Sequence, residues 1–166
     1  AHGVRWSGSS PVFGGFIPPR IHIGNGGSIT LGSHFCCGSG VVLSALGDAR
    51  IEIGSGVHMN DRSSIVAASL VMIKNGVKIA PEVAIMDTNF HATAPGRDCS
   101  ARAVVIMDNV WIASRAMVLR GVTIGAHSIV SAGSVASRNV PPYSIAVGNP
   151  AAVVSTFQCP ADWRRA

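Results

Sequence analysis

Histidine side chains are the groups in this sequence best suited to move a proton near neutral pH. An imidazole has an unperturbed pKa of about 6.5, so it can take the proton of a hydroxyl that attacks an acyl group. His91 is the best placed, because it follows Ile85 by six residues and directly precedes residues 92–103 (ATAPGRDCSARA), where a regular apolar pattern stops. We expect His91 to occupy the next inward position at the base of a loop and to act as a catalytic base. The six histidines are His2, His22, His34, His58, His91 and His127.

Asp87 lies four residues before His91 and has two interpretations. Its carboxylate could orient the imidazole and stabilise the protonated form, as carboxylates do in catalytic triads. It could equally cap a corner or a loop. His58 and His127 fall beside inward positions of the pattern, so we expect them to be exposed or to lie in a subunit interface.

The elements that must hold these residues follow a period of six. A constant step of six drifts around an α-helix and buries no single face, so the pattern excludes a helix. Short strands joined by tight corners fit it, with glycine and asparagine available where the backbone needs positive φ. The apolar series in the C-terminal half is Ile106, Ile112, Val118, Ile124, Val130 and Ala136, and a second series precedes it by two residues from Val104 to Val140.

Three shorter runs upstream repeat the same spacing: Leu31, Cys37, Leu43; Ile53, Met59, Ile65; and Ile73, Ile79, Ile85. Each run of three hexads makes one coil with three flat sides, and stacked coils make a triangular solenoid. We expect an N-terminal cap segment at 1–20, a β-helix domain at 21–154 with an extruded loop at 92–103, and a tail at 155–166. The tail is expected to cap the prism or to pack on a neighbouring subunit.

Composition and charge narrow the classes of function. Apolar residues make up 48% of the chain and aromatic residues only 5%, so a narrow core of small aliphatic side chains is expected. The net charge is +5, but the arginines are scattered and lack the interleaved aromatics of nucleic-acid grooves. A small polyanionic ligand fits this charge better than nucleic acid.

The four cysteines show no regular spacing, which predicts free thiols and a reducing cytoplasm. No apolar run approaches the roughly 20 residues of a membrane span, and no signal peptide is visible, so we expect a cytoplasmic protein without a membrane span.

Short stretches of the sequence resemble a known repeat. IGSGVH at 53–58 and IGAHSI at 124–129 resemble the hexapeptide repeat of the left-handed β-helix acyltransferases, and the likeness covers residues 21–154. The segment from Asn109 to Val154, with its VPPYSIAVGNPA ending, and the upstream DTNFH resemble the maltose, galactoside and polysaccharide O-acetyltransferases. The resemblance implies an all-β, left-handed parallel β-helix and acetyl-CoA-dependent O-acetylation of a sugar hydroxyl, in a polysaccharide precursor or a glycoside.

The same resemblance implies roles for residues around the acceptor. His91 matches the histidine base of the family. Asn89 stands where many relatives have a second Asp, and it could bind the acceptor or position His91. Asn60 matches an acceptor-binding asparagine, although a plain corner residue is the alternative.

For the coenzyme, the resemblance implies contacts with the pantetheine arm from Ser114, Ala132 and Ser137. Trp111 would pack on the arm or fill a subunit interface. Arg138 matches a Lys or Arg that meets a CoA phosphate, a role that suits its fixed charge and several donors, although an exposed corner arginine is the alternative. The family implies a homotrimer with sites between subunits, acetyl-CoA as cosubstrate and no metal.

Two other functions stay open at this point. One is N-acetylation of an amino sugar nucleotide, and the other is a noncatalytic β-helix scaffold, because hexapeptide repeats alone establish fold and not activity. A carbonic anhydrase built on this fold would need three histidines that include a pair five residues apart. The sequence has no such pair, which argues against zinc.

Overall fold

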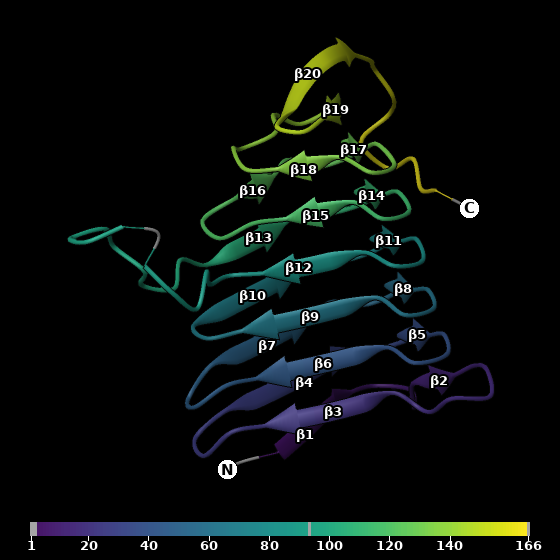
Figure 1. Cartoon of the computed structure of the whole chain (residues 1–166). Coiled ribbons are helices and arrows are strands. Elements are labelled where there is room, and N and C mark those ends of the chain that lie inside the picture. The colour runs from purple at the N-terminus through teal and green to yellow at the C-terminus, as the bar shows by residue number, and fades with distance from the viewer. Residues whose placement is uncertain (1–2, 93, 166) are drawn as a thin grey trace.

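The chain forms a triangular prism of stacked coils. The computed structural model describes residues 3–92 and 94–165, and every regular element in them is a strand. Three sheets run along the prism and make a left-handed parallel β-helix of about six turns, as predicted (Figure 1). Among the described residues, no helix is long and apolar enough to cross a lipid bilayer.

Each coil contributes one strand to each sheet, named here A, B and C in chain order. Sheet A contains β1 (Gly3–Ser7), β4 (Ser28–Gly32), β7 (Arg50–Ile53), β10 (Leu70–Ile73), β13 (Val104–Ile106) and β16 (Thr123–Ile124). Sheet B contains β2 (Val12–Phe13), β5 (Cys36–Cys37), β8 (His58–Met59), β11 (Lys78–Ile79), β14 (Trp111–Ile112), β17 (Ile129–Val130), β19 (Ser144–Gly148) and β20 (Ala151–Thr156). Sheet C contains β3 (Arg20–Ile23), β6 (Val42–Ala45), β9 (Ser64–Ala67), β12 (Ala84–Met86), β15 (Met117–Val118) and β18 (Val135–Ala136).

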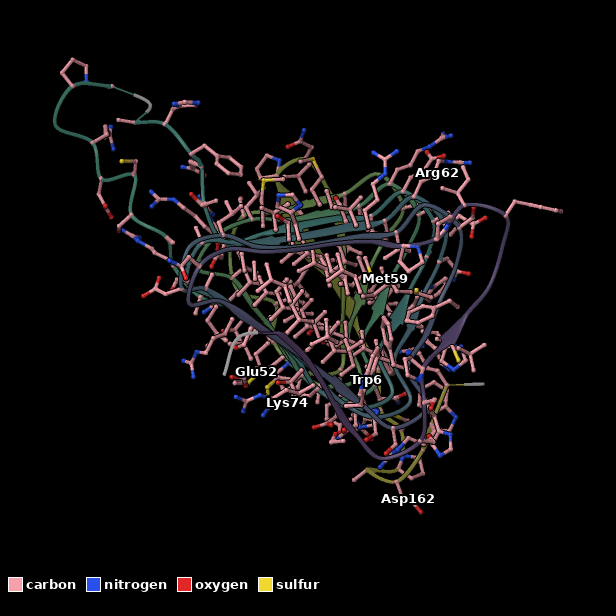
Figure 2. All side chains as sticks on the ribbon, turned by 90° about the horizontal axis from the view of Figure 1, so that it is seen from below. Trp6, Glu52, Met59, Arg62, Lys74 and Asp162 are labelled. Carbon is pink, nitrogen blue, oxygen red and sulfur yellow. The ribbon has the colours of Figure 1, made fainter. Side chains whose placement is uncertain are left out.

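The core is made of the two predicted apolar series, which point into the prism (Figure 2). Residues one coil apart pair in register, so like side chains stack on one another along each sheet. The stack in sheet A is Leu31, Ile53, Ile73, Ile106 and Ile124. Each of these side chains is at most 4% exposed, and burying one aliphatic side chain of this size contributes about 1.5–3 kcal/mol.

Glycine takes positive φ at several corners between sheets, as at Gly56 and Gly121. Asn109 does so too, with a φ of 57°, but the other non-glycine residues at positive φ include Arg62, Glu82 and Arg115, which stack at the corner between sheets B and C. Gly54 has ordinary φ and is needed for space instead, because a Cβ there would lie 2.7 Å from Oδ1 of Asn75 in the next coil. Gly54 follows β7 at the corner between sheets A and B, and neighbouring coils approach too closely there for any larger residue.

Coil geometry reaches the N-terminal end of the described chain but stops before the C-terminal end. β1 and β2 fall inside the segment expected as a cap, and they pair in parallel with β4 and β5, adding strands to sheets A and B. At the other end, β20 pairs antiparallel with β19. The tail then turns back and descends beside the prism, while the loop after β12 projects away from it (Figure 1).

Candidate functional site

The extruded loop leaves the prism at the corner between sheets C and A, and His91 lies at its base. The imidazole is exposed, so the expectation that His91 fills the next inward position is wrong. The inward position is taken by Asp87, since alternation along β12 places Ile85 and then Asp87 inside. Within residues 3–92 and 94–165, the imidazole of His91 has no hydrogen-bond partner.

Asp87 is fully buried and caps the corner of the coil below. Its Oδ1 accepts a hydrogen bond of 2.7 Å from the backbone N–H of Ala68, and its Oδ2 accepts bonds of 2.7 Å from Ser69 and Leu70. Its own carbonyl accepts a 2.8 Å bond from the N–H of Arg102, which closes the neck of the loop. These contacts are those of the capping interpretation, because the carboxylate points to backbone amides and not to His91.

The returning limb of the loop is fastened to the next coil by Arg120. Its guanidinium donates to the carbonyls of Ser100 (2.6 Å) and Asp98 (2.9 Å). Hydrogen bonds from Ser100 and then the Arg102 guanidinium hold the pKa of Asp98 well below its usual range. The outgoing limb, from Asn89 to Arg97, is exposed at every described position, and residue 93 lies outside the described part of the chain.

Phe90 is a feature of this loop that sequence reasoning missed. It adopts a φ of 62°, in the left-handed region that bulky residues rarely enter, and its ring is 54% exposed. Thr88 supports this turn because its Oγ1 accepts a 3.0 Å bond from the Phe90 N–H, while the carbonyl of Asn89 accepts one from His91. An aromatic side chain directly before His91 in the sequence was the available signal.

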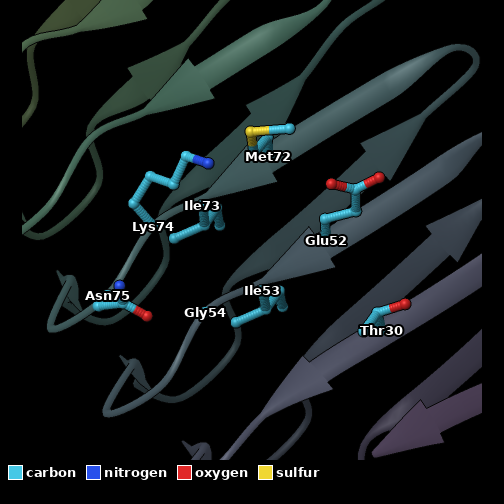
Figure 3. A pocket seen from close by; sticks show the side chains of 8 residues that line it. All are labelled: Thr30, Glu52, Ile53, Gly54, Met72, Ile73, Lys74 and Asn75. Atoms are coloured by element: carbon cyan, nitrogen blue, oxygen red, sulfur yellow. The ribbon is translucent and has the colours of Figure 1, made fainter. Parts of the chain in front are cut away.

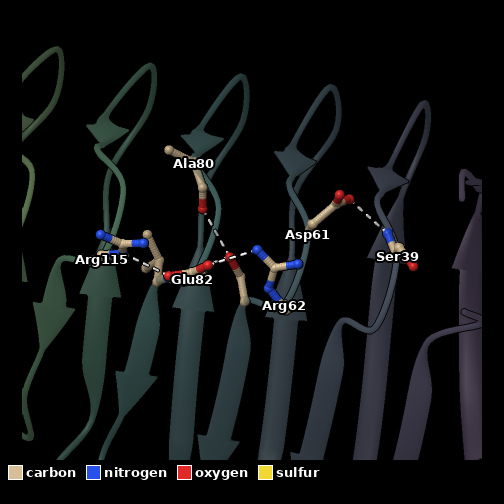
Figure 4. Close-up of polar contacts among 8 residues, drawn as sticks. Ser39, Asp61, Arg62, Ala80, Glu82 and Arg115 are labelled. Atoms are coloured by element: carbon tan, nitrogen blue, oxygen red, sulfur yellow. Dashed lines mark hydrogen bonds and ion pairs between the residues drawn. The ribbon is translucent and has the colours of Figure 1, made fainter.

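Ser114 and Ala132 lie together at the corner between sheets B and C. They line a cavity of about 390 Å³ with Glu82 and Arg115. Glu82 links its own coil to the coils on both sides, since Arg115 Nε and Arg62 Nη2 each donate to it at 2.7 Å (Figure 4). These hydrogen bonds, from Arg115 first and then Arg62, lower the pKa of Glu82.

Ser137 and Arg138 lie at the opposite end of β18, at the corner from which the loop departs. Both are exposed. Ala132 precedes β18 and Ser137 follows it, so the predicted coenzyme contacts flank the outer face of sheet C from both sides. Arg138 stands two coils above the loop base, on the same edge as His91.

Trp111 and Asn60 lie on a different face of the prism from the loop. Trp111 points outward from β14 in sheet B and is 41% exposed. Asn60 follows β8 at an exposed position, and its Nδ2 donates to the carbonyl of Ile79 at 3.1 Å. It lines a cavity of about 220 Å³ beside His58 and Cys36. One chain therefore does not bring Trp111 or Asn60 to His91.

His127 is buried by its own chain, which corrects the expectation that it would be exposed or lie in a subunit interface. Its ring stacks on Tyr143 at a centroid distance of 4.8 Å, and its Nδ1 accepts a 2.9 Å bond from Nδ2 of Asn109. The C-terminal tail covers it, with Arg165 donating to the His127 carbonyl at 2.6 Å and Trp163 at a ring distance of 6.4 Å. The tail thus packs on the corner between sheets A and B of its own chain.

The four cysteines, Cys36, Cys37, Cys99 and Cys159, are free thiols, as predicted. Burial, with a smaller effect of Cys36, raises the pKa of Cys37 to about 11, so this thiol stays protonated. In the described ranges no group of three or more His, Cys, Asp or Glu side chains is placed to hold a metal ion.

Comparison with known proteins finds similarity to hexapeptide-repeat transferases. Residues 103–137 match the family described as bacterial transferase hexapeptide (six repeats). Galactoside O-acetyltransferase of Escherichia coli K12 is 33% identical over 109 residues, which are 64% of this chain and 54% of the relative. Galactoside O-acetyltransferase of Lactococcus lactis is 32% identical over 111 residues, with 64% and 53% covered. The chain spans about half the length of these relatives.

Solved structures agree with the fold. A hexapeptide-repeat acetyltransferase of Vibrio cholerae complexed with acetyl coenzyme A superposes with a TM-score of 0.59 at 26% identity, covering 90% of this chain and 72% of that one. A galactoside acetyltransferase in complex with coenzyme A gives a TM-score of 0.63 at 24% identity, covering 94% and 65%.

Proposed function

We propose that this chain, a hexapeptide-repeat protein related to the galactoside O-acetyltransferases, transfers an acetyl group from acetyl-CoA to a sugar hydroxyl, with His91 as general base. The observation that carries the proposal is the position of His91, exposed at the base of an anchored loop on an otherwise regular prism. Rigid scaffolds commonly present catalytic side chains on such loops.

The chemistry needs a base, because a sugar hydroxyl is barely ionised at neutral pH. His91 would accept the hydroxyl proton as the oxygen attacks the thioester carbonyl. As the carbon–sulfur bond breaks, the protonated imidazole returns that proton to the sulfur of CoA. The result is an acetyl ester, free CoA and a neutral His91, so protons balance over the cycle. Asp87 would serve as a positioning residue that holds the backbone from which the loop departs.

Sheet C offers a path for the coenzyme. Ser114 and Ala132 have small side chains and border the cavity of about 390 Å³ at one corner, while Ser137 and Arg138 lie at the other. A pantetheine arm laid across this face would meet exposed backbone groups beside small residues. The exposed guanidinium of Arg138 would then meet a phosphate of CoA.

Assembly is part of the proposal, because the candidate residues lie on separate faces. Trp111 and Asn60 on sheet B are remote from the corner that carries His91. A homotrimer that sets the loop of one subunit against sheet B of the next would join them, with Asn89 and Asn60 contacting the acceptor. We place the enzyme in the cytoplasm, where acetyl-CoA is made and thiols such as Cys99 stay reduced.

The test is release of CoA in the presence of a panel of hydroxyl sugars and amino sugars. His91→Ala should lower kcat by about 10²–10⁴-fold, while His22→Ala, an exposed histidine on β3, should leave it unchanged. Full activity in His91→Ala would refute the mechanism. Turnover with amino sugars alone would favour the N-acetyltransferase, and absence of acetyl-CoA binding by calorimetry would favour the scaffold. Sedimentation equilibrium tests the trimer.

A further inference from the structure

A second cavity lies on sheet B, where the C-terminal tail packs against the prism. Lys78 and Trp111 are register partners on neighbouring coils, and both side chains point outward. The tail brings Trp163 and Arg165 beside them. These four residues line a cavity of about 320 Å³, at the small end of the roughly 300–1,000 Å³ typical of ligand pockets.

The tail side of this cavity is fixed in place by hydrogen bonds to Asn109 and His127. Asn109 donates from Nδ2 to the carbonyl of Trp163 at 3.0 Å and accepts from the Arg165 N–H at 2.9 Å through Oδ1. Arg165 also donates from Nε to the Asn109 carbonyl at 3.1 Å and from Nη2 to the His127 carbonyl. Both Trp163 and Arg165 are thus held before any ligand arrives, which lowers the entropic cost of binding.

The charge of this cavity is of one sign. Among the described residues that line it, Lys78 and Arg165 carry charge and none carries a carboxylate. The cavity of about 290 Å³ on sheet A gives a contrast, because Glu52 and Lys74 both line it and balance each other (Figure 3). The sheet B cavity should therefore favour anions, whereas the sheet A cavity should not.

The remaining walls are aromatic. Trp111 and Trp163 are 41% and 39% exposed, so each presents a broad flat surface to solvent. The Arg165 guanidinium lies 4.9 Å from the Trp163 ring centroid, which keeps that positive charge beside an aromatic face. Flat apolar surfaces next to fixed cations suit a ligand that combines a ring with a negative charge.

We propose that this cavity binds an acidic saccharide, with a sugar ring against the two indoles and its carboxylate between Lys78 and Arg165. Sugar rings expose C–H faces that pack on aromatic surfaces, and charge-assisted hydrogen bonds hold the carboxylate. Trp111, also the predicted neighbour of the coenzyme arm, would stand where coenzyme and saccharide meet. The assignment of the acidic saccharide as acetyl acceptor rests on the proposed function, whereas its binding does not.

The binding test is a tryptophan fluorescence titration without acetyl-CoA. The probes are a glucuronate-containing disaccharide, its neutral glucose counterpart of the same linkage, and inorganic phosphate at constant ionic strength. The acidic disaccharide should bind at least about tenfold more tightly than either other probe, because only it uses both the indoles and the cations. Equal affinity for the neutral sugar or for phosphate would overturn the proposal.

Lysine variants supply a matched pair, since Lys74 and Lys78 are the only lysines of the chain. Lys78→Gln should weaken binding of the acidic disaccharide by about tenfold. Lys74→Gln, on sheet A, should leave it unchanged. An unchanged Kd in Lys78→Gln with an unchanged Tm would refute the site.

Turnover separates this inference from the proposed function. If neutral sugars are acetylated as fast as acidic ones and Lys78→Gln has no effect on KM, the acidic saccharide is not the acetyl acceptor, while the acetyltransferase stands. If the acidic disaccharide binds in a Lys78-dependent way but no sugar releases CoA, the proposed function fails and the binding site stands.

Discussion

Two segments leave the prism at different corners and are held in opposite ways. In the end-on view the loop extends from one corner, whereas Asp162 of the tail lies at another (Figure 2). The loop is fastened at its neck and returning limb, by Asp87 and Arg120, and its outgoing limb is exposed. The tail is bonded to Asn109 and His127 over several contacts.

This difference indicates two tasks. A limb with few contacts can adjust to a ligand or to a neighbouring subunit, because local stability depends on local contacts. A segment tied by several hydrogen bonds acts as a fixed wall. Variants at the three anchors should therefore have different effects. A change at Asp87 should affect global stability, one at Asn109 the docking of the tail, and one at Arg120 the order of the loop.

The largest effect is expected at the neck of the loop. Asp87→Ala leaves three backbone N–H groups without their acceptor, which should lower the free energy of unfolding by about 3 kcal/mol. Urea unfolding measures it. The control is Asp61→Ala, which removes one exposed bond to the Ser39 N–H and should cost less than about 1 kcal/mol. Equal losses in both variants would show that Asp87 is not an anchor.

Releasing the tail should have the next largest effect. Asn109→Gly keeps the positive φ and removes three side-chain hydrogen bonds, to His127, Trp163 and Arg165, so tail docking should weaken by about 2 kcal/mol. Hydrogen exchange at the Arg165 amide should accelerate while amides of β10 keep their protection. Unchanged exchange at Arg165 would mean that other contacts hold the tail.

Loosening the loop should cost less in global stability. Arg120→Gln removes two hydrogen bonds to the loop carbonyls of Asp98 and Ser100. The free energy of opening the loop should fall by about 1–2 kcal/mol. Trypsin should then cut faster after Arg97, whereas the Tm should fall little. Arg50→Gln, at an exposed ion pair on sheet A, is the control and should leave the cleavage rate unchanged.

The smallest expected effect is a pH dependence of the tail. Burial, followed by the charges of Arg164 and Arg165, lowers the pKa of His127 below its usual 6.5. The unfolded chain therefore binds the proton more readily, so stability is complete above pH 6.5 and falls as pH drops from there toward the folded pKa. The loss should be below about 1 kcal/mol between pH 7 and 6.

The hydrogen bonds of Asn109 support that sign. Nδ2 of Asn109 is fixed as the amide nitrogen because it donates to the carbonyl of Trp163, so Nδ2 also donates to Nδ1 of His127. A proton on Nδ1 would remove this second hydrogen bond. The other groups that face the imidazole are Asp108, Tyr143 and Cys159. His127→Gln should flatten the pH dependence of Arg165 exchange. His58→Gln should preserve it, although burial and Lys78 lower the pKa of His58 too.

The comparison also separates what the sequence could predict from what it could not. The apolar series through Ile106 and Ile124 predicted the coils, because every sixth residue lies in the interior of the prism. The break in the series after Ile85 predicted the position of the loop. The burial of His127 could not be predicted, because the tail that covers it lies 36 residues later in the chain and does not follow the six-residue period. Asp87 displaced His91 from the interior because alternation along β12 continues for one further step.

For the candidate site, spacing placed His91 beside a loop but could not place Trp111 relative to it. The two residues lie on separate faces, and their separation follows from how three sheets close into a prism. The cavity formed by Lys78 and Arg165 was also beyond sequence reasoning, because it joins residues 87 positions apart.

The loop neck has a consequence for how such chains can change. Val71 pairs with Val104 and Ile85 with Val118, so the coils below and above stay in register although the intervening chain is longer than in any other coil. Because the entropy of closing a loop grows only with the logarithm of its length, doubling such an insertion costs about 0.6 kcal/mol. This corner therefore tolerates insertions, so segments of different length and chemistry can replace the loop without a change in the coils below and above it.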